Sequence, residues 1–561
     1  MVNGILIAFL ISLIGTVNLN FEQLKQPIKY LKGWYNNLKW GVIVALVLAY
    51  IAMPPLVFPY VLTPIFITLG INCVVTLYNN LVGKNKTNIL VLDKKVLNNA
   101  KLPIFLIIFI LALWLLTPLY PILRAQELNQ IPEVTLNQEK ISSIDTQHIR
   151  QVPMEFARWK ADKVVGELGN KVNVGELSIQ LYKGKLFWVA PLEFENFFKW
   201  FKFKTSPGYV MVDAENPEVS AERIDNKELK YMQKSYLQTN AYRRIYQKYP
   251  FYLFREFNFE IDENGKPWIT VSATKPTVWN KGEKVHGIII LNLETGDTQF
   301  YELGNVPEWV DIVFSETLAE EYNYWYGAYK HGYVNTLFTQ KDMHIPTPYG
   351  FIGADVFAVN VNNSLVWFTG HTSPSSQDQS MVGYSTIDTR TGKFTFYSNV
   401  SGYYNEVAAI SNANSKVSNF EGYHGAQPVF YNLFGELTWV VPILSSNNQL
   451  QKIALVHAST GEVILGDTLE QSLDLYRKWI RNNIGDIQIS DSNLETVDGV
   501  ISRIGGNYIL LENNNQLFTF EFTDNNTNKA EFELSQKGDS VRITHMDGEV
   551  NEFDNLELGL V

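Results

Sequence analysis

Apolar residues are concentrated in the first quarter of this 561-residue chain. Four stretches are almost purely apolar: residues 4–17, 40–58, 61–81 and 103–123. All but the first are about long enough to cross a hydrocarbon layer of roughly 30 Å as a helix. The pattern therefore predicts four transmembrane helices within residues 1–124, followed by a large polar remainder at residues 125–561.

Beyond residue 124 the pattern changes to short β-rich runs separated by turn residues. Hairpins with a Thr-Gly turn recur at residues 287–301, 382–397 and 453–464, and residues 207–219 form a looser fourth copy. Each copy is followed by helix-compatible sequence, at residues 308–326, 405–417, 471–480 and 227–247. Because a hairpin cannot bury its apolar face alone, we expect each helix to pack on the hairpin before it.

The last part of the chain predicts a separate β unit. Its successive strands are expected at residues 497–504, 508–511, 517–522, 530–534, 540–546 and 549–556. Closing such a sheet into a small barrel removes its exposed edges.

The predicted fold class is α+β, in four regions. A four-helix transmembrane region covers residues 1–124, and a first extracytoplasmic unit covers 125–280. Further hairpin/helix units cover 281–484, and the small β-barrel covers 485–561.

The positions of the lysines orient the predicted helices. Four lysines lie within residues 25–39 and five within residues 84–101, and positively charged loops stay on the cytoplasmic side. The amino terminus is then outside, and the fourth helix delivers the large carboxy-terminal region to the outer face. The alternative is that residues 4–17 belong to a signal peptide, although no charged side chain precedes them and no small-x-small cleavage site follows.

The region outside the predicted membrane segment is acidic. Residues 1–123 hold nine of the 46 basic and two of the 57 acidic side chains, which leaves a net charge of −18 for the rest. This charge argues against nucleic acid or an anionic lipid surface as the main partner, because both would repel an acidic exterior. The single cysteine, Cys73, lies in the third predicted span, so the exterior has no disulfide to form, which fits a bacterial surface.

Catalytic signatures are sparse. The eight histidines lie far apart, and only the stretch from His331 through Asp342 to His344 places metal ligands near each other in sequence. The zinc-peptidase motif H-E-x-x-H and the nucleophile motif G-x-S-x-G do not occur. We therefore predict no catalytic residues, no metal site and no cofactor.

Aromatic residues crowd two short stretches, at 194–203 and 322–333. One interpretation is core packing. The other is a binding surface, because Tyr and Trp give a large contact area at little entropic cost. For residues 197–203, interleaved with lysines, a third interpretation is a segment that rests on the outer membrane interface. The candidate binding residues are Trp200, Tyr322, Trp325, Tyr326 and Tyr329.

Three resemblances extend this picture. The hairpins at residues 455–464 and 291–298 resemble the closing hairpin of PepSY domains, in which a helix packs on a short antiparallel sheet and whose proposed roles include restraining peptidases. The carboxy-terminal strands resemble a small OB-type barrel, here acidic. The whole chain is similar to large uncharacterised membrane proteins of Gram-positive bacteria and their phages.

Together these patterns predict a multipass protein of the cell membrane. We expect it to be an extracytoplasmic scaffold or regulatory binding protein that contacts the lipid bilayer and another envelope protein or a second copy of itself. A motif-less envelope hydrolase or a cell-wall-binding factor is the alternative.

Overall fold

The computed structural model describes residues 1–561 except 1–2, 20–24, 83–93, 167–170, 350–352, 355, 362, 376–377, 401, 485–494, 513–516, 521–527, 547–548 and 559–561. The fold is α+β, as predicted. By its contacts the chain divides into two compact units, one formed by Met1–Gln138 and Val152–Val407, the other by Glu139–Gln151 and Ala408–Val561.

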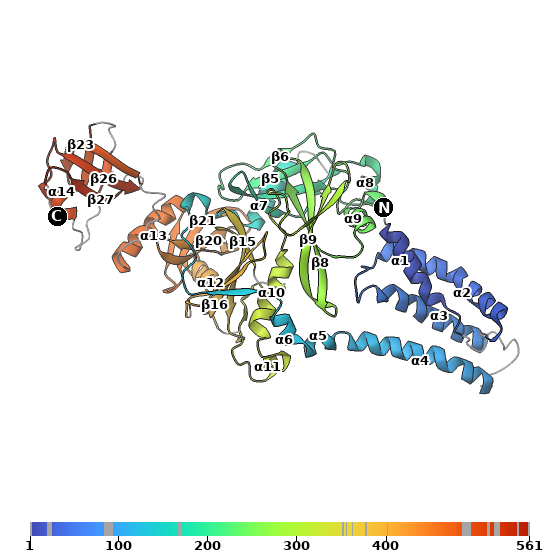
Figure 1. Ribbon diagram of the computed structural model, residues 1–561. Coiled ribbons are helices and arrows are strands. Elements are labelled where there is room, and N and C mark those ends of the chain that lie inside the picture. The colour runs from blue at the N-terminus through green and yellow to red at the C-terminus, as the bar shows by residue number, and fades with distance from the viewer. Residues whose placement is uncertain are drawn as a thin grey trace. The chain divides into compact units, whose positions relative to one another are not determined.

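The amino-terminal part of the first unit is helical (Figure 1). Its helices are α1 (Gly4–Leu13), α2 (Pro27–Val47) with a π-helical extension (Leu48–Ala52), α3 (Leu62–Val82), α4 (Lys94–Leu116), α5 (Leu119–Leu123) and α6 (Ala125–Asn129). The Asn72 side chain on α3 donates hydrogen bonds to the carbonyl oxygens of Gly15 and Val17, at 3.1 and 2.6 Å. This buried amide joins α3 to the end of the first helical segment.

The prediction of four membrane spans is not supported. Within the described residues, one helix, Pro27–Ala52, is long and apolar enough to cross a membrane, and a signal sequence near the amino terminus would pass the same test. The other apolar helical stretches are Gly4–Thr16, Leu62–Tyr78 within α3 and Ala100–Leu116 within α4, and they have 10–17 residues, fewer than the roughly 20 that a span requires. The second predicted span also begins earlier than expected, because the lysine-bearing residues before it continue the helix.

Four sheets each contain an antiparallel meander whose strands pair in chain order. The meanders are β3 (Ser178–Tyr182), β4 (Lys185–Glu193), β5 (Tyr209–Asp213) and β6 (Glu222–Ile224); β7 (Leu253–Ile261), β8 (Pro267–Val278), β9 (Lys281–Asn292) and β10 (Thr298–Glu302); β14 (Phe357–Val361), β15 (Ser364–Thr372), β16 (Gly383–Asp388) and β17 (Phe394–Tyr397); and β19 (Val429–Leu433), β20 (Glu436–Leu444), β21 (Leu450–His457) and β22 (Val463–Gly466).

Short strands extend three of these sheets. The strands β2 (Asn173–Val174), β11 (Ile345–Pro346) and β18 (His424–Gly425) pair with β4, β15 and β20, and β1 (Val134–Asn137) pairs in parallel with β17. A separate two-stranded pair consists of β12 (Pro348–Tyr349) and β13 (Gly353–Ala354).

The repeated hairpins of the sequence are the last two strands of each meander. In the three close copies the turn glycines Gly296, Gly392 and Gly461 have φ of 76°, 72° and 72°, so each occupies the left-handed region that Thr-Gly turns require. The looser copy pairs β5 with β6 across a longer connection, residues 214–221. The hairpin pattern therefore marks a unit that occurs four times, and each unit has four strands, twice the number in the hairpin.

Helices lie before, within and between the meanders and after the last one. They are α7 (Met154–Val165), α8 (Phe197–Phe203), α9 (Ala241–Lys248), α10 (Glu316–Ala328), α11 (Tyr333–Leu337), α12 (Glu406–Lys416) and α13 (Leu469–Asn483). As predicted, α13 packs on the hairpin before it, since Ser472 donates to the carbonyl oxygen of Ile453 at 2.9 Å. The helix α10 contacts both the sheet before it, where the Tyr322 hydroxyl donates to the carbonyl oxygen of Glu283 on β9 at 2.9 Å, and the sheet after it, where the Asn323 side chain lies 3.3 Å from Thr369. Helical spacing identifies the apolar face but not the sheet that covers it.

The last five strands form a closed barrel in the order β23 (Glu495–Gly505), β24 (Tyr508–Leu511), β25 (Leu517–Thr519), β27 (Glu549–Asn555) and β26 (Ser540–Met546). A single parallel pair, Thr519 with Glu549, closes β25 on β27. The strand predicted at residues 530–534 is wrong, because Asn528–Leu534 is a helix, α14. Its Phe532 ring packs on Phe520 inside the barrel with ring centroids 4.3 Å apart.

Candidate functional site

The aromatic residues proposed from the sequence lie on two helices. Tyr322, Trp325, Tyr326 and Tyr329 share α10, whereas Trp200 lies on α8. Tyr322, Trp325 and Trp200 are buried, and Tyr326 and Tyr329 are half-buried. The structure therefore brings four of the five together, with much of their surface in the core of the first unit.

Tyr326 leads to a buried histidine pair. Its ring contacts that of His344, with centroids 5.4 Å apart. His344 Nδ1 lies 2.8 Å from Nδ1 of His371, and His371 Nε2 lies 2.9 Å from the side-chain oxygen of Asn323. Burial lowers the pKa of His344 to about 4 and lowers that of His371 further below its usual range. Both imidazoles are therefore neutral near pH 7, and one nitrogen of the close pair must carry the shared proton.

A buried carboxyl lies beside this pair. Glu406, at the start of α12, accepts a hydrogen bond from the backbone N–H of Gly370 at 2.7 Å, next to His371 in β15. Burial raises the pKa of the Glu406 carboxyl to about 7, against the opposing effect of that N–H. A carboxyl that is partly protonated near pH 7 thus lies beside two neutral imidazoles.

A second polar site forms where the β8–β9 hairpin reaches the amino-terminal helices. This hairpin, hereafter the arm, is the longest of the described hairpins and turns at Trp279 and Asn280. The Tyr60 hydroxyl donates to the carbonyl oxygen of Asn280 at 2.9 Å. The Trp279 ring packs against Phe58 and Tyr120, with centroids 5.2 and 5.9 Å away. The arm tip therefore contacts the chain both just before α3 and within α5.

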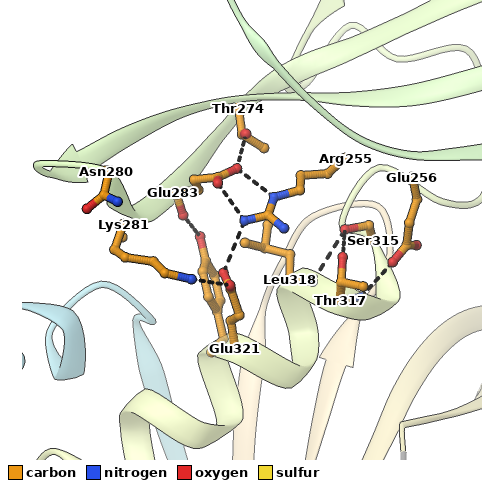
Figure 2. A network of polar contacts seen from close by, with 12 residues as sticks. Arg255, Glu256, Thr274, Asn280, Lys281, Glu283, Ser315, Thr317, Leu318 and Glu321 are labelled. Carbon is orange, nitrogen blue, oxygen red and sulfur yellow. Dashed lines mark hydrogen bonds and ion pairs between the residues drawn. The ribbon is translucent and has the colours of Figure 1, made fainter. Parts of the chain in front are cut away.

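An ion-pair network joins the arm to α10 (Figure 2). Arg255 on β7 donates two hydrogen bonds to the carboxylate of Glu283 on β9, at 2.8 and 2.5 Å. The hydroxyl of Thr274 also donates to this carboxylate. Glu321 on α10 lies 3.5 Å from Arg255 and 3.4 Å from Lys281. The hydrogen bond to Glu283 raises the pKa of the Arg255 guanidinium, so it stays charged.

Backbone contacts reinforce this network, hereafter the arm junction. The Tyr322 hydroxyl donates to the carbonyl oxygen of Glu283 at 2.9 Å. Glu256 accepts from the backbone N–H groups of Glu316 and Thr317 at 3.0 and 2.8 Å, at the start of α10. A carboxylate is stabilising there because the first N–H groups of a helix are unpaired and its N-terminus is positive. The arm junction therefore holds α10, β7 and β9 in one arrangement.

Two further carboxyl groups are buried beneath the second meander. Glu260 accepts from Thr270 at 2.5 Å and from the backbone N–H of Asp311 at 2.7 Å. The Asp311 carboxyl accepts from the N–H of Leu181 at 2.7 Å. Burial raises the pKa of both carboxyl groups, and their mutual repulsion raises that of Asp311 further. The Arg390 guanidinium opposes both shifts.

A small recess of about 60 Å³ opens in the first unit. Its lining residues are Glu176, Pro191, Glu193, Gln233, Lys234, Phe257, Phe259 and Ile269. Glu193 is buried, and burial raises the pKa of its carboxyl, although Lys234 at 3.4 Å lowers it. Glu176 raises it too. The recess thus combines two carboxyl groups, one ammonium and two phenyl rings.

The metal ligands that lie close in sequence separate in space. His331 Nε2 lies 3.0 Å from an Asp342 carboxylate oxygen at the surface, whereas His344 turns inward to His371. Among the described residues no three or more His, Cys, Asp or Glu side chains gather as metal ligands would.

Sequence analysis missed the arm junction, the histidine pair and Glu406. Arg255 and Glu283 are 28 positions apart, and His344 and His371 are 27 apart. Residues that pair between strands or between sheets lie far apart in the chain, so no short sequence spacing reveals the pair. One signal was present: charged residues interrupt the otherwise apolar strands that contain Arg255 and Glu283.

The chain matches no protein-family model. It matches no curated protein. Among solved structures it is similar to an ACO/RPE65 chimera in a monoclinic crystal form, at 9% identity and a TM-score of 0.13, over 52% of this chain and 49% of the chimera. A mutant of the apocarotenoid oxygenase from Synechocystis gives 8% identity and a TM-score of 0.14, over 68% and 65% of the two chains. This chain thus covers about half of the chimera, and TM-scores this low support no inference about fold or activity.

Proposed function

We propose that this chain is a membrane-anchored extracytoplasmic scaffold or regulatory binding protein that engages another envelope protein. The observation that carries the proposal is the exposed face of α11. Val334 and Leu337, three positions apart on one side of the helix, are 68% and 58% exposed, and Phe338, the residue after the helix end, is 79% exposed. Soluble surfaces rarely keep large apolar side chains together without a partner.

Anchoring follows from the amino-terminal helices. Pro27–Ala52 is the candidate span, and the shorter apolar helices are proposed to complete a multipass region. The basic residues within 25–39 and 84–101 are proposed to lie on the cytoplasmic side, which leaves the acidic carboxy-terminal region outside.

The arm junction suits a scaffold. A bidentate Arg–carboxylate pair fixes geometry as well as adding energy. Here it braces β7 against β9 in one sheet, and the β8–β9 hairpin of that sheet contacts residues just before α3 and within α5. The exterior of the first unit is therefore held firmly against the anchoring helices. The helix-and-meander units are proposed to be PepSY-like, and the proposed roles of that family include restraining or regulating peptidases.

The barrel is proposed to be OB-type, and to hold a protein segment rather than nucleic acid. Its order, with α14 between the third and fourth strands, supports this. Arg542, one of its few basic residues, is paired with both carboxylate oxygens of Asp498 at 2.8 and 3.0 Å. A fragment of residues 491–561 should fold alone as a β protein. Binding of single-stranded DNA at about 0.15 M salt would contradict the proposal.

A photo-crosslinking residue at Phe338 tests the binding function. In living cells it should capture a discrete envelope protein, and the combined changes Val334→Ser and Leu337→Ser should abolish that product. The matched control is the same crosslinker at Val219, another exposed apolar side chain of the first unit. Equal products at both positions, or none at Phe338, would refute the assignment of α11 as the binding face.

The recess favours a second candidate, an envelope hydrolase. A carboxyl with a raised pKa beside a second carboxyl is the arrangement that general acid–base catalysis uses. Under this alternative Glu193→Gln abolishes cellular function while capture at Phe338 persists. Under the scaffold proposal the same variant leaves function intact.

A further inference from the structure

The helix α8 exposes an aromatic patch with no covering element among the described residues. Phe198 is 80% exposed and Phe201 is 61% exposed. The Phe197 ring contacts both of them, with centroids 5.9 and 6.0 Å away, and also contacts Tyr236 at 5.2 Å. Leu237, next in the chain, is exposed as well. These five residues, hereafter the α8 patch, form one continuous apolar surface.

The α8 patch is held in place from below. Trp200 is buried under α8, and its indole N–H donates to the hydroxyl of Thr239 at 3.2 Å. Thr239 ends the 3₁₀ turn Leu237–Thr239, and α9 begins two residues later. The exposed phenyl rings are therefore presented outward by a fixed support, since the tryptophan beneath them fills the core side of the helix.

The helix α9, which follows the Leu237–Thr239 turn, contacts the amino-terminal helices. Tyr246 on α9 donates to the carbonyl oxygen of Pro54 at 2.7 Å, and Arg243 donates to that of Tyr50 at the end of the span Pro27–Ala52. The N–H of Leu56 donates to the carbonyl oxygen of Pro250 at 2.7 Å. Figure 1 shows α9 beside the start of α1. The α8 patch is thus linked to the end of the candidate span through the Leu237–Thr239 turn and α9.

Lysines flank the rings, although the exterior as a whole is acidic. Lys204 lies over the rings of Phe201 and Trp200, at 4.0 and 4.5 Å from their centroids, and Lys202 lies over Phe203 at 5.2 Å. Lys199 pairs with Glu195. Exposed aromatic rings with ammonium groups at their edge match the boundary between acyl chains and phosphate headgroups.

We propose that the α8 patch inserts into the outer leaflet of the same bilayer that holds the amino-terminal helices, as a second point of membrane contact. This inference rests on the proposed anchoring. Phe198 and Phe201 enter the acyl boundary, while Lys202 and Lys204 reach lipid phosphates. The arm tip, with Trp279 among aromatic rings, would provide an interfacial contact at another position.

Depth-dependent quenching in lipid nanodiscs tests the proposal with the full chain. In a Cys73→Ser background, Phe198→Cys carries an environment-sensitive fluorophore, and the discs contain phosphatidylcholine and phosphatidylglycerol with or without a spin label high on the acyl chain. The matched control is Val219→Cys, an exposed apolar position in the connection that follows β5. The strand β5 itself follows α8 in the chain. We expect loss of emission at position 198 and none at 219.

The outcomes separate the two proposals. A chain that fails to co-purify with the discs would refute both the anchor and the α8 contact. Co-purification with an unquenched probe at 198 would keep the anchor and overturn the α8 contact, leaving the patch to a protein partner. Adding Lys202→Glu and Lys204→Glu should reduce quenching at 198, and unchanged quenching would contradict the proposed role of the lysines.

Discussion

Removing Arg255 should destabilise the arm junction far more than removing Arg255 and its partner together. The Glu283 side chain is only 3% exposed, and Arg255 supplies two of its hydrogen bonds. Arg255→Met leaves that carboxylate buried and short of donors. Breaking a buried pair on one side costs about 3–5 kcal/mol, whereas replacing both partners is often nearly neutral. Because the Thr274 hydroxyl still donates to Glu283, we expect the lower end of that range.

The assay is hydrogen exchange of the full chain in detergent, followed by mass spectrometry of peptides from β9 and α10. A cost of about 3 kcal/mol corresponds to roughly a hundredfold faster exchange. The double variant Arg255→Met, Glu283→Gln should return to within about tenfold of the unmodified chain. Lys281→Met is the control, because its ion pair with Glu321 is half exposed and such pairs contribute about 0–1 kcal/mol.

Equal exchange in Arg255→Met and in the double variant would refute this account of the arm junction. It would mean that the guanidinium contributes packing rather than neutralising a buried charge.

Two further predictions concern the repeat units. Gly392→Ala should destabilise the β16–β17 hairpin more than Gly184→Ala destabilises β3–β4: both have positive φ, costing about 1–2 kcal/mol, but only at Gly392 would the new Cβ lie 2.2 Å from the Phe314 ring. An equal increase in hydrogen exchange of the β16–β17 hairpin in Gly392→Ala and of the β3–β4 hairpin in Gly184→Ala would contradict this prediction. The second prediction concerns pH. Because the folded pKa of His344 is about 4 against 6.5 for a free imidazole, the unfolded chain binds more protons between these values, and His344 removes stability as the pH falls through that window, by up to about 3 kcal/mol. Glu406, with a raised pKa of about 7, has the opposite effect, so the test compares the unmodified chain with His344→Gln. The melting temperature of the unmodified chain should fall more steeply than that of the variant between pH 7 and pH 4. Equal pH dependence of the two melting temperatures would refute the prediction.

Local pattern was sufficient to predict the hairpins. Thr-Gly turns between alternating strands report a positive φ at the glycine, so β9–β10, β16–β17 and β21–β22 were found at their observed positions. Four of the barrel strands, β23, β24, β26 and β27, agree within a residue or two, since glycine and asparagine turns separate them. Residues 530–534 failed because a short run with one buried phenylalanine has no clear period, and α14 serves equally to cover the barrel.

Which aromatic and ionisable side chains are buried depends on tertiary contacts that the sequence pattern does not reveal. The aromatic spacing of residues 322–329 is the same for an exposed anchor and for a core helix, and only the neighbouring sheet buries Tyr322 and Trp325. The count of four spans is not supported, because the apolar stretches of three of the four helices have only 10–17 residues. The carboxyl and imidazole groups of the interior meet across separate strands, so their altered pKa values have no counterpart in the linear pattern.

Cysteine accessibility in intact bacterial cells tests the central claim, a chain held in the membrane with its large carboxy-terminal region outside. In a Cys73→Ser background, Asn448→Cys lies in the exposed turn between β20 and β21, and Asn36→Cys lies on the exposed face of α2 among the lysines. An impermeant maleimide should label position 448 in intact cells and position 36 only after permeabilisation. Labelling at 36 from outside, or none at 448 until the cells are opened, would contradict the account.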